Sequence, residues 1–363
     1  GRDRAGELTK ANRNSINILN ENILTYNKQF NEDHSINVVA GYTFQKEVNE
    51  LMSATNRGLS ASSVDQATLS GGTDIQIPSS NRREWLLKSF LGRVNYNLME
   101  KYLFTFSFRR DGSSRFGAAN KWANFPSVAL GWRIIEEDFF QNAGLNTIFS
   151  DLKLRTSWGI TGNSEIPVYN SQANLNEYNY VFGDNLVLGL ADARLSNPDL
   201  RWESTQMFNV GLDLSFLQNK LNLTADYFYN TTEDLLLFVT VPSSLGFSSI
   251  LKNSGSLENK GFELGLNYIA IDNQDLRWDI SGNISFLRNK ITDLGSSTPF
   301  FSSSTSGHLG VDGSWVEAGN PIGVWRGFNY IGLFQTQEEI DSSPSRSGDL
   351  PGYPRYQDTN NDG

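Results

Sequence analysis

The stretch KYLFTFSFRRDGSSRFGAANKWANFPSVALGWRI, residues 101–134, decides the fold of this chain. It reads as two strands joined by a polar, glycine-bearing connection over residues 111–125. Side chains along a strand point alternately to opposite faces of a sheet. In each strand one of these faces is bulky and apolar, and it carries Tyr102, Phe104, Phe106 and Phe108 in the first and Val128, Leu130, Trp132 and Ile134 in the second. The opposite faces hold mainly small or polar residues, so a sheet with one apolar and one polar face is expected.

The same alternation recurs along most of the chain. It predicts further strands over residues 16–30, 35–45, 87–98, 152–161, 208–216, 221–230, 262–268 and 278–286. Residues 136–146 are acidic and aromatic, and we expect one helical turn there. The pattern therefore predicts an all-β, antiparallel fold with about ten strands of similar kind.

The connections between these strands alternate in length. Short connections are expected at 31–33, 99–100, 218–219 and 272–275, a moderate one at 136–150, and longer ones at 49–81, 111–124, 162–202, 242–256 and after 291. Outer-membrane barrels have short periplasmic turns and long extracellular loops. A soluble β-sandwich has no reason to sort its loops in this way. We therefore expect a transmembrane β-barrel, and we place the strand-like segment 322–334 within one large extracellular loop.

Composition is compatible with such a barrel. Apolar residues make up 38% of the 363 residues, and no apolar run approaches the ~20 residues of a membrane helix. A barrel needs no such run, because every second residue can face a wet lumen. The net charge of −10 argues against nucleic-acid binding, and the absence of cysteine excludes disulfides and thiolate metal sites.

The chain begins without Met, has no apolar leader and ends at DTNNDG, so we expect it to be an internal fragment. Ten strands with open edges would be costly in lipid, because unpaired backbone groups there find no water. Residues beyond both ends are thus expected to complete the barrel.

Eight phrases in register resemble the SusC/RagA family of TonB-linked outer-membrane proteins. They are RRDGSSRFG (109–117), FPSVALGWRI (125–134), LKLRTSWGITGN (152–163), NPDLRWE (197–203), FNVGLDLSFLQNKLNLTADYF (208–228), NSGSLENKGFEL (253–264), PIGVWRGFNYIGLF (321–334) and YQDTNNDG (356–363). The resemblance covers nearly the whole chain in the family's order. It implies part of a barrel of 22 strands in a Gram-negative outer membrane, with the plug domain upstream of residue 1 and absent here.

The resemblance also implies a function. The complete protein would import oligosaccharides or peptides, together with a SusD-like surface lipoprotein and with energy supplied through TonB. Residues 1–291 would belong to the barrel, and 292–363 to a truncated extracellular loop region with local β structure. An outer-membrane hydrolase is a poor alternative, because the two histidines, His34 and His308, are remote in sequence. A β-rich surface adhesin without transport is the remaining alternative.

The two faces give candidate residues for each environment. Lumen-facing residues are expected to be Arg93, Ser107, Arg109, Arg133, Arg155, Asp213 and Asp226, and lipid-facing residues Phe104, Phe106, Leu130, Trp132, Leu212 and Ile280. Tyr102, Trp132, Trp202 and Trp278 lie near expected strand ends and fit an interfacial aromatic girdle. For the aromatic residues expected in loops, Trp122, Tyr178 and Tyr180, a more specific hypothesis is that they stack on sugar rings of a ligand.

One motif could bind a metal ion. Asp358, Asn360, Asp362 and the final Gly363 match the start of a calcium loop, D-x-[DN]-x-[DN]-G. An Asn/Asp/Gly turn is the simpler reading of the same residues. No catalytic residue and no other cofactor is expected.

Overall fold

The computed structural model describes residues 6–59, 68–295, 298–304, 312–345 and 348–359. This part of the chain divides into two compact units, one of residues up to 289 together with 295, the other of residues 290–294 and those from 298 onward. None of the helices in these ranges is long and apolar enough to cross a membrane.

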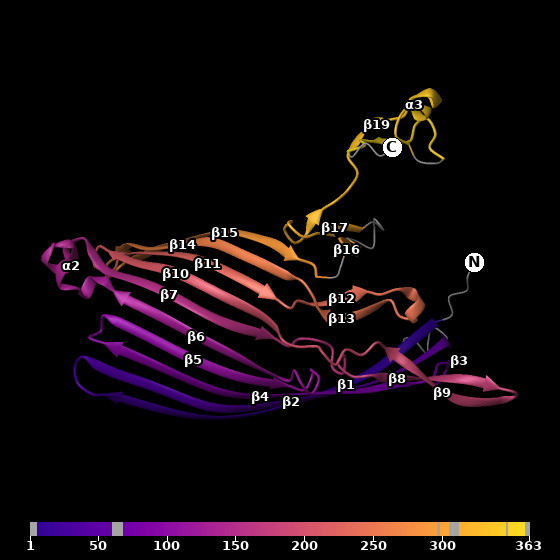
Figure 1. Cartoon of the computed structure of the whole chain (residues 1–363), viewed down its shortest axis with the longest axis horizontal. Coiled ribbons are helices and arrows are strands. Elements are labelled where there is room, and N and C mark those ends of the chain that lie inside the picture. Colours follow the sequence, from indigo (N-terminus) through magenta and orange to yellow (C-terminus); the bar gives the residue numbers. More distant parts are fainter. Residues whose placement is uncertain (1–5, 60–67, 296–297, 305–311, 346–347, 360–363) are drawn as a thin grey trace. The chain divides into compact units, whose positions relative to one another are not determined.

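A single large sheet makes up most of the first unit, and only the end of its last strand lies in the second. Its strands follow the order β1-β2-β4-β5-β6-β7-β10-β11-β14-β15, so chain neighbours are also sheet neighbours, while the short β3 pairs with β2 (Figure 1). The bounds are β1 Gly6–Gln29, β2 His34–Leu59, β3 Asp74–Ile75, β4 Ser79–Leu98, β5 Tyr102–Ser113, β6 Trp122–Arg133, β7 Phe149–Asn163, β10 Glu203–Phe216, β11 Leu221–Glu233, β14 Ser256–Asp272 and β15 Arg277–Asp293. Every pairing from β1 to β14 is antiparallel. The predicted succession of ten antiparallel strands is confirmed.

Most strands are longer than the alternation predicted. The expected long loop over 49–81 is wrong, because β2 continues to Leu59 and β4 begins at Ser79. Residues 49–58, NELMSATNRG, are mostly polar, and their two large apolar residues, Leu51 and Met52, are adjacent and so do not alternate. They are extended because their main chain pairs with β1 on one side and, on the other, with β4 as far as Ser53 and with β3 at Asn56 and Arg57.

Short connections gather at one end of the sheet. They are residues 30–33, 99–101, 217–220 and 273–276. At two of these turns the chain takes positive φ in successive residues, with Met99 and Glu100 at 56° and 55°. Such turns match the twist of the strands that they join. The connection 134–148 at this end holds η1 (Ile134–Glu136), α2 (Asp138–Asn142) and η2 (Leu145–Thr147), so the expected helical turn is present.

The opposite end carries the more elaborate connections. The predicted loop 162–202 contains the hairpin β8 (Asn174–Phe182)–β9 (Asn185–Arg194), and the loop 242–256 gives way to the hairpin β12 (Leu236–Thr240)–β13 (Ser249–Asn253) with η3 (Ser243–Leu245). The connection between β5 and β6 shrinks to residues 114–121, because both strands extend into the expected loop. It is therefore shorter than 134–148, and the strict alternation in length is wrong at this one place.

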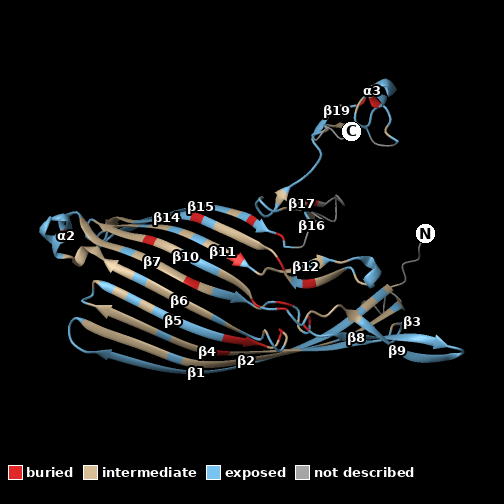
Figure 2. Cartoon of the chain, viewed as in Figure 1, coloured by how far each residue is buried: buried red, intermediate tan, exposed pale blue. Residues whose placement is uncertain are grey.

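A small hydrophobic core ties these connections together; we call it the loop core. Its members are Phe116, Ile166, Leu200, Trp202 and Leu251. Phe116 and Leu200 are 0% exposed, and the Phe116 and Trp202 rings lie 5.4 Å apart. The Trp202 indole also donates to the Lys121 carbonyl at 3.0 Å. Trp202 was expected in an aromatic girdle, but it is buried among loops, and buried residues gather where the strands meet these loops (Figure 2).

Arg115 adds polar contacts beside the loop core. Its guanidinium donates to the Glu165 carboxylate at 2.7 Å and to the Ile166 carbonyl at 3.0 Å, and it lies 4.9 Å from the centre of the Trp85 ring. The Ser171 hydroxyl donates to the Arg115 carbonyl. The motif RRDGSSRFG thus joins the end of β5 to the connection between β7 and β10.

The second unit consists of short elements. It contains β16 (Phe300–Ser304), β17 (Asp312–Val316) and β18 (Val324–Trp325) in one sheet, β19 (Tyr330–Leu333) and β20 (Pro354–Tyr356) in another, and α3 (Gln337–Asp341). The strand-like segment 322–334 is therefore two short strands in different small sheets, and neither belongs to the large sheet.

Candidate functional site: the two faces of the sheet

The register of the large sheet sorts the predicted residues by face. Residues that pair directly across neighbouring strands lie on the same side of a sheet. Arg93 pairs with Ser107, and Arg155 with Gly211, which in turn pairs with Asp226. All seven residues predicted to face the lumen share one side, which we call the polar face. Phe104, Phe106, Leu130, Trp132 and Leu212 share the other, the apolar face.

Three of these residues form a charge cluster on the polar face. The Arg155 guanidinium donates two hydrogen bonds to Asp213, both of 2.8 Å, and two longer ones to Asp226, of 3.1 and 3.2 Å. Each side chain is about a third exposed or less. Gly211 makes room for the cluster, because a Cβ there would collide with the Asp226 carboxylate and with the Arg155 guanidinium. Arg155 holds two like charges together.

Replacing Arg155 with methionine should destabilise the wall by about 1–3 kcal/mol, because two half-buried carboxylates would lose their partner. Urea unfolding of the complete protein measures this loss. The matched control combines Arg155→Met with Asp213→Asn and Asp226→Asn, which removes all three charges and should recover most of the stability. A single variant as stable as the wild type would contradict the assigned role of Arg155.

A row of neutral side chains, all but one able to hydrogen-bond, crosses the polar face at one level; we call it the amide row. Direct register pairs link Asn27, Asn37, Asn95, Thr105, Ala129, Ser157 and Asn209 over seven strands. The Thr105 hydroxyl donates to Asn95 and the Asn95 amide donates to Asn37, both at 2.9 Å, and the Asn37 amide donates to Asn27. Amide orientations of this kind are set by the hydrogen-bond network.

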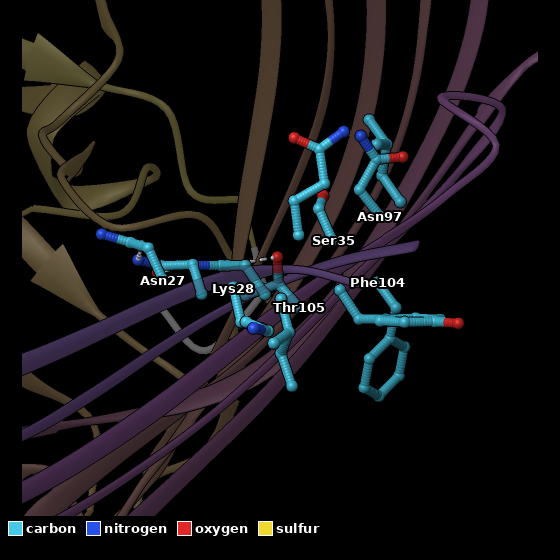
Figure 3. A pocket seen from close by; sticks show the side chains of 12 residues that line it. Asn27, Lys28, Ser35, Asn97, Phe104 and Thr105 are labelled. Carbon is cyan, nitrogen blue, oxygen red and sulfur yellow. Dashed lines mark hydrogen bonds between the residues drawn. The ribbon is translucent and has the colours of Figure 1, made fainter. Parts of the chain in front are cut away.

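The amide row borders a hollow of about 480 Å³. Figure 3 shows Asn27, Ser35, Asn97 and Thr105 around it, contributed by β1, β2, β4 and β5. Among the described side chains, Asn97 has a buried Oδ1 without a hydrogen-bond partner. The hollow therefore offers several neutral donors and acceptors, and Lys28 and Phe104 also line it (Figure 3). Asparagines at alternate positions in the sequence hinted at this surface, but only the register aligns them.

Among the described residues of this unit, nothing packs against the apolar face. Phe106 is 44% exposed, and Leu130, Phe104 and Leu264 are exposed as well. A soluble sandwich would bury such a face against a second sheet. The described sheet instead presents it continuously from β4 to β14.

Comparison with known proteins explains this arrangement. A family model described as "TonB dependent receptor-like, beta-barrel" matches residues 3–361. The chain belongs to this family. Its members are outer-membrane transporters and not enzymes.

Similarity to individual proteins narrows the position of this chain within the family. TonB-dependent receptor P3 of Formosa agariphila is 38% identical over 360 residues, 99% of this chain and 36% of that protein. TonB-dependent receptor SusC of Bacteroides thetaiotaomicron is 42% identical over 217 residues, 57% of this chain and 21% of that protein. The solved RagAB peptide transporter matches at a TM-score of 0.79 and 30% identity, over 90% of this chain and 35% of that one. The predicted SusC/RagA membership is confirmed, and the chain spans about a third of the length of P3 and of the RagAB chain.

The short-turn end of this receptor barrel holds an ordered aromatic cluster. The Tyr102 hydroxyl and the Trp132 indole both donate to Glu137, at 2.6 and 2.9 Å, and the Lys101 ammonium lies 3.7 Å from the same carboxylate. The Tyr102 and Trp132 hydrogen bonds hold the pKa of Glu137 below its ordinary value. Glu137 therefore orients both aromatic side chains.

The aromatic residues predicted to lie in loops are placed differently. Trp122 is the first residue of β6, on the apolar face, where it stacks on Phe90 at 6.0 Å. Tyr178 and Tyr180 lie in the hairpin strand β8 and are exposed. The loop position was therefore wrong for Trp122, which pairs within the large sheet, whereas Tyr178 and Tyr180 lie in the expected long connection between β7 and β10, in a hairpin strand. Ligand stacking by Tyr178 and Tyr180 stays a prediction.

We searched the described residues for His, Cys, Asp and Glu side chains that could share a metal ion. In the part of the chain that the structure describes, no three His, Cys, Asp or Glu residues are placed to hold a metal ion. Of the predicted calcium ligands, Asp358 is described, whereas Asn360 and Asp362 lie outside the described residues.

Proposed function

We propose that this chain forms part of the wall of a SusC/RagA-type transporter that imports oligosaccharides or peptides across the outer membrane. The polar face lines the lumen, and the apolar face contacts lipid. One observation carries the proposal: from β4 to β14 the antiparallel register, shifted only between Ser215 and Phe216, keeps the two faces separate, with apolar side chains left exposed.

The short turns face the periplasm and the hairpin end faces the cell exterior. This orientation follows the loop asymmetry of outer-membrane barrels. The hairpins β8–β9 and β12–β13 would then meet substrate and a SusD-like surface lipoprotein, and TonB would act through upstream parts of the complete protein. The similarity to SusC and to the RagAB peptide transporter supports these partners.

Uptake by a deletion strain tests the proposal. Cells lacking the gene and its paralogues should lose accumulation of labelled oligosaccharides or peptides, and the wild-type gene should restore it. Restored uptake should disappear when the proton gradient is collapsed. Unchanged uptake of every compound in the deletion strain, with loss of surface attachment instead, would favour the adhesin alternative.

A further inference from the structure

A second hollow lies on the apolar face, near the short-turn end of the sheet. It has a volume of about 500 Å³, within the range of pockets that hold small ligands. Its lining is almost wholly apolar and comes from four neighbouring strands; its side chains on this face are Tyr96, Leu98, Tyr102, Phe104, Leu130, Trp132, Leu154 and Thr156. The linings of the two hollows share Tyr96, Leu103 and Phe104, but the asparagines of the amide row line only the other one.

Thr156 explains why a depression exists here. It pairs with Leu130 on one side and with Val210 on the other, and its side chain is shorter than that of Leu130. Its hydroxyl donates to the Asn209 carbonyl at 3.2 Å, so its polar group is already satisfied by the main chain. An apolar ligand would therefore leave no hydrogen bond unmade at this position.

The edge of the hollow is polar and carries more negative than positive charge. Tyr102 and Trp132 point their polar atoms to Glu137, while Lys101 lies 3.7 Å from Glu137 and 3.9 Å from Asp138. The Asp138 side chain is 91% exposed and open to a further cation. An anionic group at this edge would meet two carboxylates with one lysine between them. An ammonium group would find Asp138 available.

We propose that this hollow binds an acyl chain of a membrane phospholipid whose headgroup carries an ammonium group, with that group at Asp138. The inference rests on the proposed membrane setting of the apolar face. The acyl chain lies over Thr156 between the side chains of Phe104, Leu130 and Leu154. Trp132 and Tyr102, oriented by Glu137, mark the level of the headgroup, as aromatic side chains with a polar tip do at membrane surfaces.

Filling the hollow tests the acyl-chain site. Thr156→Trp places a large side chain in the depression, and Ala225→Trp is the matched control, because Ala225 lies on the same face but does not line the hollow. Native mass spectrometry of the complete detergent-solubilised protein, titrated with phosphatidylethanolamine, measures retained lipid. Thr156→Trp should weaken retention about tenfold, and Ala225→Trp should match the wild type. Equal retention by both variants would overturn the site.

The proposed contact between the ammonium headgroup and Asp138 is tested by comparing lipids with different headgroups. The wild type should retain phosphatidylethanolamine better than phosphatidylglycerol, and Asp138→Asn should reduce this preference without abolishing lipid binding. Better retention of phosphatidylglycerol would overturn the headgroup assignment. Substrate uptake, measured in the same variants, separates the two proposals: uptake without lipid retention refutes only the lipid site, and lipid retention without uptake in the wild type refutes only transport.

Discussion

Replacing Phe116 with alanine is expected to open the loop core while leaving the strands of the wall paired. The Phe116 side chain is 0% exposed and packs against Trp202, in a cluster whose members come from three connections, including its own. Removing a fully buried phenylalanine costs about 3–5 kcal/mol. Because the core holds loops and not strands, this loss should appear as local opening.

Hydrogen exchange on the complete protein measures that opening. Amides in residues 114–121 and 164–172 should exchange about a hundredfold faster or more, since each 1.4 kcal/mol is a factor of ten. Amides of β10 and β11 should keep their protection. Phe182→Ala is the matched control, because Phe182 is 75% exposed in β8 and should change neither region. Unaltered exchange around residue 116 would mean that the loop core does not hold the connections.

Replacing Phe106 with arginine should be the most damaging single change on the apolar face. Phe106 lies between Val94 and Val128 in the register and is exposed on the face that we propose contacts lipid. An arginine near the bilayer midplane costs about 2–4 kcal/mol in an outer-membrane barrel. Unfolding of the complete protein from liposomes by guanidinium measures this cost.

The neighbouring position supplies the comparison. Ser107 lies on the polar face, opposite Arg93 and within hydrogen-bond distance of Ser127. An arginine there would meet a like charge across the strand pair, at a cost of about 0.2–1 kcal/mol. The lipid penalty should therefore exceed the polar-face penalty severalfold. Similar stability of the two variants would show that Phe106 does not face lipid.

Local alternation was sufficient to predict the wall, because each strand must sort its side chains between two environments. The prediction from alternation failed in segments whose side chains do not have to be sorted between two environments. Residues 49–58 and 79–86 extend the strands through main-chain pairing and cross-strand ion pairs such as Arg82–Glu50, without a regular apolar alternation. The hairpin over 174–194 does carry alternating apolar residues, in Tyr178, Tyr180 and Phe182 and in Leu186, Leu188 and Leu190, but they were assigned to a long loop. The turn positions were predicted well, since short connections leave the chain few choices.

The faces of the candidate site were predictable, but its contacts were not. Arg155, Asp213 and Asp226 were all placed on the polar face, yet their association depends on the register of three strands and on the absence of a side chain at Gly211. The amide row requires the register of seven strands. The loop core joins residues from 116 to 251, and no sequence spacing relates them.

The loop core also separates the hairpin tips, whose sequence can vary, from the strands of the wall, whose sequence is constrained by folding. The hairpin β8–β9 springs from segments that Ile166 and Leu200 anchor, and β12–β13 is held through Leu236 and Leu251. Beyond these anchors the hairpin strands pair with each other and not with the strands of the large sheet. A library that varies only the tips, or a graft that exchanges whole hairpins, would therefore explore new binding surfaces on an unchanged scaffold. Designing recognition and keeping the barrel foldable become two separate tasks.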